Sequence, residues 1–158
     1  GPRKEGARSV VDGKILRVKD DWSGTVARVD DRLLRLLLDH GYTPVVSPPA
    51  VTPEGEVINV DSDRAAAAVA GALRAEALLL LTNVSGLLRD VADPSSRIPR
   101  IPKAEIEAYL PVAAGRMRKK LVAAQEALAQ GVRRVVIASS AVDRPIDRAL
   151  GGEGTVIE

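Results

Sequence analysis

Two uninterrupted apolar segments, at residues 77–81 and 135–138, restrict the fold more than any other feature of the sequence. Strands that are apolar on both faces lie inside a sheet that helices cover on each side. An alanine-rich helical pattern precedes the first segment, and a longer one over residues 115–130 precedes the second. This alternation predicts an α/β fold, a three-layer sandwich with a mainly parallel central sheet.

The composition excludes several kinds of site. Phe and Cys are absent and aromatic residues make up 2% of the chain, so the core has to be aliphatic. Without Cys there is no disulfide, thiolate metal site or Cys nucleophile. The lone histidine, His40, cannot form a cluster of imidazole ligands and is a poor basis for serine hydrolase chemistry. We therefore expect no metal site built from protein ligands.

The charge and hydropathy patterns indicate whether nucleic acid or a membrane is a partner of the protein. With 23 basic and 21 acidic residues the formal net charge is +2, and there is no basic block or set of aromatic residues for nucleic acid. The apolar runs are too short to span a bilayer, and no signal peptide opens the sequence. We expect a cytoplasmic protein that contacts neither membrane nor nucleic acid.

At the N-terminal end, residues 1–6 read as flexible and residues 7–158 as a single domain. Residues 7–18 predict a peripheral β-hairpin with its turn at Asp12-Gly13. A helix is expected from Asp30 or Asp31 to His40, followed by Gly41 at its C′ position and by a strand over 42–46. The buried stripe predicted for this helix consists of Leu33, Leu34, Leu37 and Leu38.

Further along, residues 51–58 predict a small hairpin, and residues 103–109 predict a short helix. Residues 90–102 form the longest irregular stretch and are interpreted as a mobile loop. The glycines at 151, 152 and 154 predict a turn before a last strand over 155–157.

Three Asx residues, Asn59, Asp61 and Asp63, surround the start of the alanine-rich helix. One such side chain suffices to cap a helix, so the set is either a cap with surplus acids or one wall of a site for an anionic ligand. Lys120 also allows two interpretations, a solvated lysine on the flank of a helix or a cation that binds an anionic ligand. It lies in the first turn of the 115–130 helix, where a cation is unfavourable unless an anion binds there. The sequence leaves both choices open.

Polar residues Thr82 and Asn83 follow the first buried strand, and Gly86 provides a turn. Such a stretch suits contact with a ribose or purine at a strand's carboxyl end, although it is equally an ordinary exit from a strand. No complete glycine-rich phosphate-binding motif is present.

Four stretches together resemble the C-terminal half of amino acid kinases of the acetylglutamate kinase type. They are residues 59–63 (Asn-Val-Asp-Ser-Asp), 81–88 (Leu-Thr-Asn-Val-Ser-Gly-Leu-Leu), 115–120 (Gly-Arg-Met-Arg-Lys-Lys) and 131–135 (Gly-Val-Arg-Arg-Val). Residues 116–120 and 152–156 are most similar to the LysW-dependent aminoadipate or glutamate kinases. Those enzymes of lysine or arginine biosynthesis phosphorylate a carboxylate on an amino acid held by a small acidic carrier protein.

The resemblance implies ATP as a ligand, with Mg²⁺ bound mainly through its phosphates. Asn59 would hold the amino-acid substrate, Asp63 would organise the catalytic lysines, and Lys120 would stabilise the charge on the transferring phosphoryl group. The residues expected to line the adenine and ribose are Thr82, Asn83, Val84, Gly86, Leu87 and Met117. The basic hairpin from Arg8 to Lys19 could contact the carrier, and the full-length enzyme is expected to be a homodimer.

The family's N-terminal half, with its Lys-x-Gly-Gly strand and substrate-binding loop, has no counterpart in this sequence. We therefore expect the ATP-binding half of a carboxylate kinase, which alone is inactive because a transition-state lysine and a phosphate loop are missing. One alternative is an N-acetylglutamate kinase of arginine biosynthesis. Another is a nucleotide- or carrier-binding module without chemistry.

Overall fold

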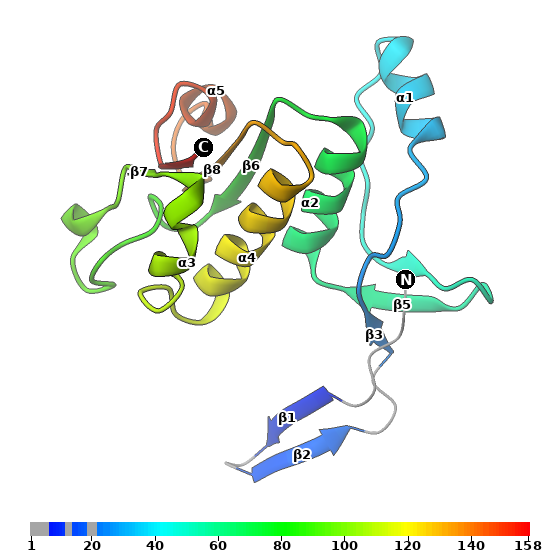
Figure 1. Ribbon diagram of the computed structural model, residues 1–158, viewed down its shortest axis with the longest axis horizontal. Coiled ribbons are helices and arrows are strands. Elements are labelled where there is room, and N and C mark those ends of the chain that lie inside the picture. The colour runs from blue at the N-terminus through cyan, green and yellow to red at the C-terminus, as the bar shows by residue number, and fades with distance from the viewer. Residues whose placement is uncertain (1–6, 12–13, 19–21) are drawn as a thin grey trace. The chain divides into compact units, whose positions relative to one another are not determined.

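The computed structural model describes residues 7–11, 14–18 and 22–158. The chain divides into two compact units, the first ending at Ala65 and the second running from Ala66 to Glu158. Figure 1 shows the elements of both, coloured along the chain. The predictions for residues 1–6 and for the Asp12-Gly13 turn lie outside the described residues.

The first unit contains the predicted hairpin and a small sheet. Strands β1 and β2 pair in antiparallel fashion, with Arg8 opposite Arg17, so the hairpin prediction is confirmed. The sheet has the order β3-β5-β4, with β3 parallel and β4 antiparallel to β5, which confirms the second hairpin. The elements of this unit are β1 (Ala7–Val11), β2 (Lys14–Val18), β3 (Ser23–Gly24), α1 (Arg32–Asp39), β4 (Ala50–Val51) and β5 (Val57–Val60).

Helix α1 forms where the pattern predicts it, but its apolar stripe is not buried. It ends as expected, with Gly41 at a φ of 78°. No residue of α1 is buried, and Leu33 and Leu38 are 63% and 47% exposed. The prediction of a buried stripe over Leu33, Leu34, Leu37 and Leu38 is therefore wrong, because the first unit presents no surface that covers it.

The strand predicted over residues 42–46 is also wrong. This segment pairs with no strand in the described part of the chain. Tyr42, Val45 and Val46 are 66%, 95% and 59% exposed. A β-propensity is realised only where a neighbouring strand supplies hydrogen-bond partners and a packed face.

The second unit is built on a four-stranded sheet of order β6-β8-β9-β7. The pairs β6–β8 and β7–β9 are parallel and β8–β9 is antiparallel, so the sheet is mainly parallel, as predicted. Helix α2 (Ser62–Leu73) leads into this unit. The other elements are β6 (Ala77–Thr82), η1 (Pro94–Ser96), β7 (Arg100–Ile101), η2 (Lys103–Glu105), α3 (Ile106–Tyr109), α4 (Gly115–Ala129), β8 (Arg134–Ser139), α5 (Pro145–Leu150) and β9 (Thr155–Ile157).

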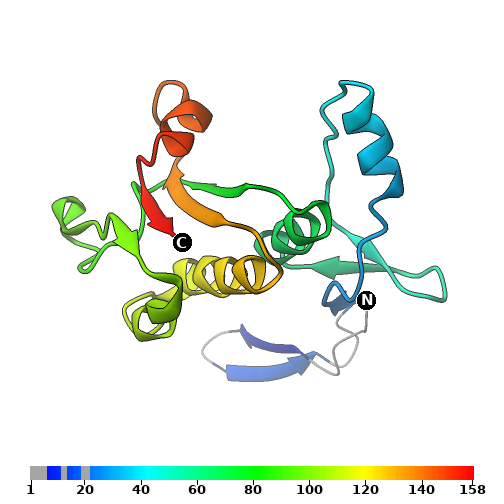
Figure 2. The same ribbon diagram turned by 45° about the horizontal axis from the view of Figure 1, so that its top comes forward.

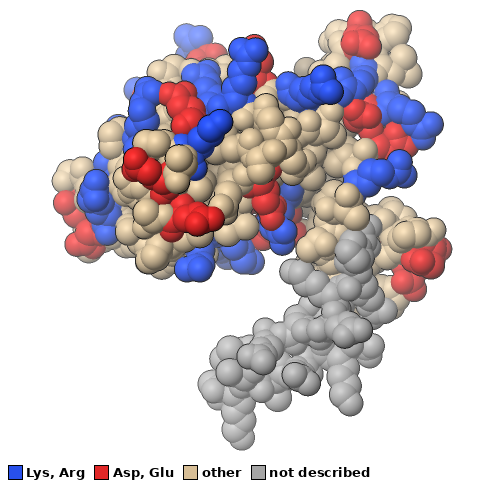
Figure 3. All heavy atoms as spheres, viewed as in Figure 1, with Lys and Arg blue, Asp and Glu red and all other residues tan. Residues whose placement is uncertain are grey.

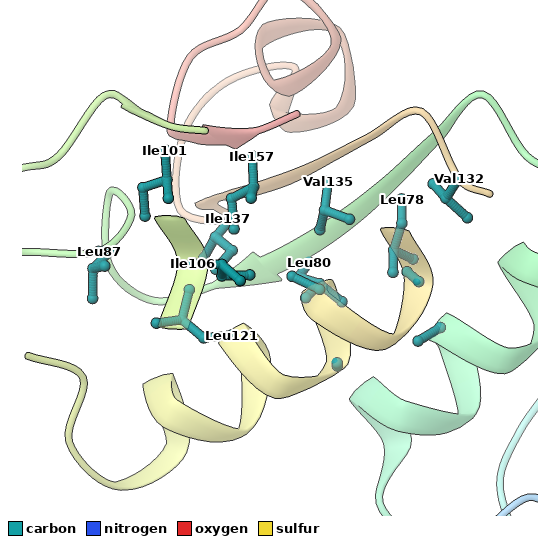
Figure 4. Close-up of a cluster of buried hydrophobic side chains, with 14 of the residues drawn as sticks. Leu78, Leu80, Leu87, Ile101, Ile106, Leu121, Val132, Val135, Ile137 and Ile157 are labelled. Carbon is teal, nitrogen blue, oxygen red and sulfur yellow. The ribbon is translucent and has the colours of Figure 1, made fainter. Parts of the chain in front are cut away.

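Helices cover both faces of this sheet, which gives the predicted three layers. Figure 2 shows α4 on one side of β8 and α5 on the other. On the α4 side, Leu80 and Ile137 pack in one cluster with Leu121 (Figure 4). On the α5 side, Val136 packs with Ala149 in a second cluster. The alternation of these side chains along β6 and β8 explains why both strands are apolar throughout.

The irregular stretch after β6 is closed on itself by polar side chains. Asp90 accepts a hydrogen bond at its Oδ1 from the Ala92 N–H (2.9 Å), and Asp93 Oδ1 accepts from the Ser95 N–H (2.8 Å). The Ser96 hydroxyl donates to the carbonyl oxygens of Asp90 (2.9 Å) and Asp93 (2.7 Å). The stretch thus contains a local hydrogen-bonded turn, around η1, which the interpretation as a mobile loop did not foresee.

Charges of both signs are interspersed over the described surface seen in Figure 3, which shows no large area of a single sign. None of the described helices is both long and apolar enough to cross a membrane.

Candidate functional site

Of the three Asx residues at the end of β5 and the start of α2, it is Asp61 whose hydrogen bonds cap the helix. Side chains alternate along β5, so Asn59 is exposed whereas Ile58 and Val60 are buried. Asp61 caps α2, because its Oδ1 accepts hydrogen bonds from the N–H groups of Asp63 (3.1 Å) and Arg64 (3.3 Å). One carboxylate therefore accounts for the helix start. The carboxylate of Asp63, half-buried in the first turn, and the amide of Asn59 are not needed as caps.

In the second unit, polar groups line the carboxyl ends of the parallel strands β6 and β8. Thr82 and Ser139 are register partners at the ends of the two strands. Ser140 donates its backbone N–H (2.7 Å) and its hydroxyl (3.0 Å) to the Thr82 carbonyl oxygen. The Thr82 hydroxyl donates to Asn83 Oδ1 (3.3 Å). The result is a rim of hydroxyl and amide groups of the kind that binds ligands in α/β proteins.

Two of these residues, Ser139 and Ser140, are absent from the predicted site. The signal that selects Thr82 and Asn83, polar residues directly after an apolar strand, applies equally to Ser139 and Ser140 after residues 135–138. Sequence reasoning could therefore have found them.

The residues after Thr82 differ in what they can offer a ligand. Asn83 is exposed and Val84 is half-buried. Gly86 is buried with a φ of 145°, which favours glycine. The side chain of Leu87 is 1% exposed and belongs to the core cluster drawn in Figure 4. The buried Leu87 side chain therefore anchors the stretch after Thr82 in the core, whereas the exposed Asn83 is available to a ligand.

The start of α4 is strongly basic and has no side-chain cap. Its N-cap residue is Ala114, whose side chain has no acceptor, and the first turn contains no acidic residue. Gly115 has a φ of 52°, in the left-handed region. Four of the five following residues are basic, namely Arg116, Arg118, Lys119 and Lys120. Because a helix N-terminus already carries a positive partial charge, this clustering costs stability unless an anion compensates for it.

The two adjacent lysines differ in environment, as their helical positions predict. The spacing of Met117, Leu121, Ala124 and Leu128 predicts an apolar stripe on this helix, with Lys120 at its edge and Lys119 pointing away. Lys119 is exposed, whereas Lys120 is half-buried. Met117 is also half-buried and packs against the core cluster. The buried middle of the stripe includes Leu121 and Ala124, each 0% exposed. Lys120 and Met117 are thus held by packing, which limits the positions that their side-chain ends can reach.

The start of α4 lies at the same end of the second unit as the rim. α4 packs on β6 and β8, and only residues 130–133 separate its end from the beginning of β8. It therefore runs antiparallel to β8, and its first turns lie towards the strand's carboxyl end. Figure 4 agrees, because Leu121 lies near Ile137 whereas Val132 lies at the opposite end of the helix. The second unit thus gathers Thr82, Asn83, Met117 and Lys120 at one end.

Asn59 and Asp63 belong to the first unit and are described within it. Among residues 22–158, no three His, Cys, Asp or Glu side chains form a group that could hold a metal ion. The described site is therefore rich in cations, hydroxyls and amides, which suits a polyanion carrying a sugar or base.

Comparison with known proteins identifies relatives of the whole chain. The profile of the amino acid kinase family matches residues 6–139. The chain is 53% identical over 157 residues to a [LysW]-aminoadipate kinase of Deinococcus radiodurans, covering 99% of this chain and 54% of that protein. It is 47% identical to the [LysW]-aminoadipate kinase of Thermus thermophilus (99% and 59%) and 37% identical to an acetylglutamate kinase of Methanosarcina mazei (98% and 55%). The chain thus spans little more than half the length of these relatives.

Solved structures share the fold. An N-acetylglutamate synthase from Neisseria gonorrhoeae, complexed with coenzyme A and N-acetyl-glutamate, matches with a TM-score of 0.79 at 29% identity, over 97% of this chain and 36% of that one. A carbamate kinase from Giardia lamblia bound to AMP-PNP matches with a TM-score of 0.68 at 24% identity, over 96% and 51%. The predicted amino acid kinase-like fold is confirmed.

Proposed function

Because the chain belongs to the amino acid kinase family, we propose that it supplies the ATP-binding part of a carboxylate kinase. The observation that supports the proposal most is the start of α4, which is basic and has no side-chain cap. It lies at the same end of the second unit as the polar rim formed by Thr82, Asn83, Ser139 and Ser140. A helix N-terminus surrounded by cations is a site for phosphate. The rim beside it offers hydroxyl and amide groups to a nucleoside.

The phosphates of ATP would bind at the first turn of α4. Its N–H groups and the neighbouring basic side chains supply the positive charge that a triphosphate requires. Lys120 is the residue we assign to the transferring phosphoryl group, because packing beside the apolar stripe limits its movement. Mg²⁺ would neutralise part of the phosphate charge, and it would be held mainly through ATP, because the described residues include no group of three His, Cys, Asp or Glu side chains that could hold it.

The adenine and ribose would lie along the stretch after β6. Thr82 and Asn83 offer polar groups, while Val84 and Met117 offer half-buried apolar surface for the base. Gly86 and Leu87 would shape this wall, since Gly86 is buried and the Leu87 side chain packs in the core. Asn59 would bind the amino-acid substrate, and Asp63 would hold the catalytic lysines in their productive arrangement.

In the reaction, a carboxylate oxygen of the substrate attacks the γ-phosphorus of ATP, the bond between that phosphorus and the β,γ-bridging oxygen breaks, and ADP leaves. The products are an acyl phosphate and ADP. No side chain has to act as a nucleophile, so positioning and positive charge account for the catalysis. This chemistry agrees with a chain that has no Cys and one His.

Among carboxylate substrates, we propose 2-aminoadipate or glutamate attached to a carrier protein. The relatives with 53% and 47% identity are [LysW]-aminoadipate kinases, whereas the acetylglutamate kinase is 37% identical. The hairpin β1–β2 is our candidate for contact with the acidic carrier, because it brings Arg8 opposite Arg17. Lys19, at the end of this basic segment, lies outside the described residues. An N-acetylglutamate kinase remains the second candidate.

We further propose that α1 and residues 42–46 pack against polypeptide corresponding to the part of the relatives that this chain does not match. Leu33, Leu36 and Val45 are 63%, 55% and 95% exposed. The relatives are nearly twice as long, and the match to them includes these residues. The chain alone would then bind ATP without catalysis, and the complete enzyme would be the homodimer expected of the family.

Calorimetric titration with ATP·Mg²⁺, together with hydroxylamine trapping of acyl phosphate, tests the proposal. We expect the chain to bind ATP·Mg²⁺ and to form no acyl phosphate at ordinary enzyme rates. Adding the remaining part of the Deinococcus radiodurans relative is expected to produce hydroxamate from carrier-linked aminoadipate. Failure to bind ATP·Mg²⁺ would exclude a nucleotide site in this chain.

A further inference from the structure

Thr155, the first residue of β9, is a buried polar residue that none of the roles above uses. It is 0% exposed, and with Thr52 it is one of two buried polar residues in the described part of the chain. A buried hydroxyl costs free energy unless it is hydrogen-bonded. The hydrogen-bond partners of the Thr155 hydroxyl therefore indicate its structural role.

Both partners of the Thr155 hydroxyl lie at the base of the loop after β6. The oxygen accepts a hydrogen bond from the Leu87 N–H (2.8 Å) and donates its proton to the Ile98 carbonyl oxygen (2.6 Å). Leu87 and Ile98 are themselves joined, because the Ile98 N–H donates to the Leu87 carbonyl oxygen (2.8 Å). One hydroxyl thus ties both ends of the intervening loop to β9.

Gly86 allows the loop to lie close to Thr155, and Gly154 allows the residue before β9 to lie close to β8. A Cβ on Gly86 would lie 2.5 Å from the Thr155 hydroxyl oxygen, and one on Gly154 would lie 2.4 Å from the Ile137 carbonyl oxygen. Either contact is shorter than atoms tolerate. The backbone before Leu87 therefore rests directly on β9, and its position depends on what Thr155 holds.

We infer that Thr155 is a positioning residue for the nucleotide site. Its hydroxyl holds the Leu87 N–H, and Leu87 ends the stretch that begins at Thr82 and contains Asn83 and Val84. The hydroxyl thereby fixes the position of Asn83 and Val84 relative to the sheet. This inference rests on the proposed function, because it assigns the stretch to ATP.

Replacement of Thr155 by valine tests the inference, since valine keeps the shape and removes the hydroxyl. Two buried backbone groups, the Leu87 N–H and the Ile98 carbonyl, then lose their partner. We expect ATP·Mg²⁺ affinity to fall by about tenfold or more and the Leu87 amide to exchange with solvent faster. Thr155→Ser retains the hydroxyl and is the matched control, with affinity and exchange close to those of the unmodified chain.

The outcomes are distinguishable. If Thr155→Val binds ATP·Mg²⁺ as tightly as the unmodified chain while the Leu87 amide exchanges faster, the hydroxyl does not position the site. Equal losses in folded Thr155→Val and Thr155→Ser would also overturn the inference. If Thr155→Val does not fold, Thr155→Ala is compared with Thr155→Ser by the same two measurements. An unmodified chain that binds no ATP·Mg²⁺ would instead refute the proposed function, and this inference with it.

Discussion

Ser140 donates two hydrogen bonds to the carbonyl oxygen of Thr82, one from its backbone N–H (2.7 Å) and one from its hydroxyl (3.0 Å). The contact joins the ends of β6 and β8, which are distant in sequence. It fixes the exit of the chain from β6, where the residues assigned to the nucleoside begin.

Removal of the Ser140 hydroxyl is expected to loosen this exit without unfolding the protein. In Ser140→Ala the backbone hydrogen bond remains, so the free energy of unfolding should fall by no more than about 1 kcal/mol. ATP·Mg²⁺ affinity should fall severalfold, as measured by calorimetry. Ser85→Ala, at an exposed serine of the stretch after β6, is the control. Equal affinities of the two variants would contradict a role for the Ser140 hydroxyl.

Lys119 and Lys120 form a matched pair for testing the phosphate site. Each substitution to alanine removes one positive charge from the first turns of α4, but Lys120 is half-buried and Lys119 is exposed. We expect Lys120→Ala to weaken ATP·Mg²⁺ binding by about tenfold or more, and Lys119→Ala to change it about twofold, because exposed charges are screened. Similar losses in both variants would mean that general positive charge, and not the position of Lys120, binds the ligand.

Asp61 and Asp63 should separate stability from function. Asp61→Ala removes the cap of α2 and is expected to lower the free energy of unfolding by about 1 kcal/mol in chemical denaturation. Asp63→Asn retains the size of the side chain but removes the acid of the first turn of α2, so the free energy of unfolding should fall by about 0.5 kcal/mol. In an enzyme reconstituted with the remaining part of the Deinococcus radiodurans relative, Asp63→Asn should lower kcat by about a hundredfold. A kcat that falls only with Asp61→Ala would reverse these assignments.

The apolar side chains of α1 are expected to contribute little to the stability of this chain. Leu33→Ser should change the free energy of unfolding by no more than about 0.5 kcal/mol, because the side chain is already exposed. Leu121→Ala, in the core, should cost about 2–5 kcal/mol. When the remaining part of the relative is co-expressed, Leu33→Ser should weaken its association with the chain in size-exclusion chromatography. Unchanged association would exclude α1 from that interface.

The carboxyl of Asp30 should titrate unusually low. Its hydrogen bonds with the Arg32 side chain and backbone lower its pKa from 3.8 to about 2. The pKa is lower in the folded state, so the stabilising effect of the pair is complete above about pH 4 and is lost as the pH falls through about 2. Titration followed by carboxyl NMR shifts should show that the Asp30 pKa rises towards its usual value in Arg32→Ala, which loses the side-chain hydrogen bond and keeps the backbone one. In the control Arg35→Ala, the Asp30 pKa should remain low.

The sequence predicts those elements whose burial is local to one unit. Residues 77–81 and 135–138 are apolar on both faces, and each becomes a strand covered by helices. The stripe of α4, with Leu121 in its centre, is buried as its spacing predicts. In these cases helix and sheet are neighbours along the chain, so periodicity contains the information that determines the packing.

The wrong predictions concern segments whose burial or pairing depends on polypeptide that is distant in the sequence. The spacing of the leucines in α1 shows that a helix face is apolar but not what covers it, and residues 42–46 require a neighbouring strand. Thr155 escapes prediction for a similar reason, because a threonine in a strand has no local pattern that reveals partners at Leu87 and Ile98. Ser139 and Ser140 differ, since they follow an apolar strand as Thr82 and Asn83 do, so the same local pattern indicates them.

The position of β9 makes the form of a distant loop depend on the completion of the sheet. β7 is an edge strand whose neighbour in the sheet is β9, and Arg100 pairs with Val156. This pairing spans about as much chain as the contact of β6 with β8, in which Ala77 pairs with Arg134. Both contacts have to close long stretches of chain during folding. The Leu87 N–H and the Ile98 carbonyl find their partner only when Thr155 is in place. The loop between them should therefore acquire its native form only after β9 has joined the sheet, so that nucleotide binding would report completion of the whole unit.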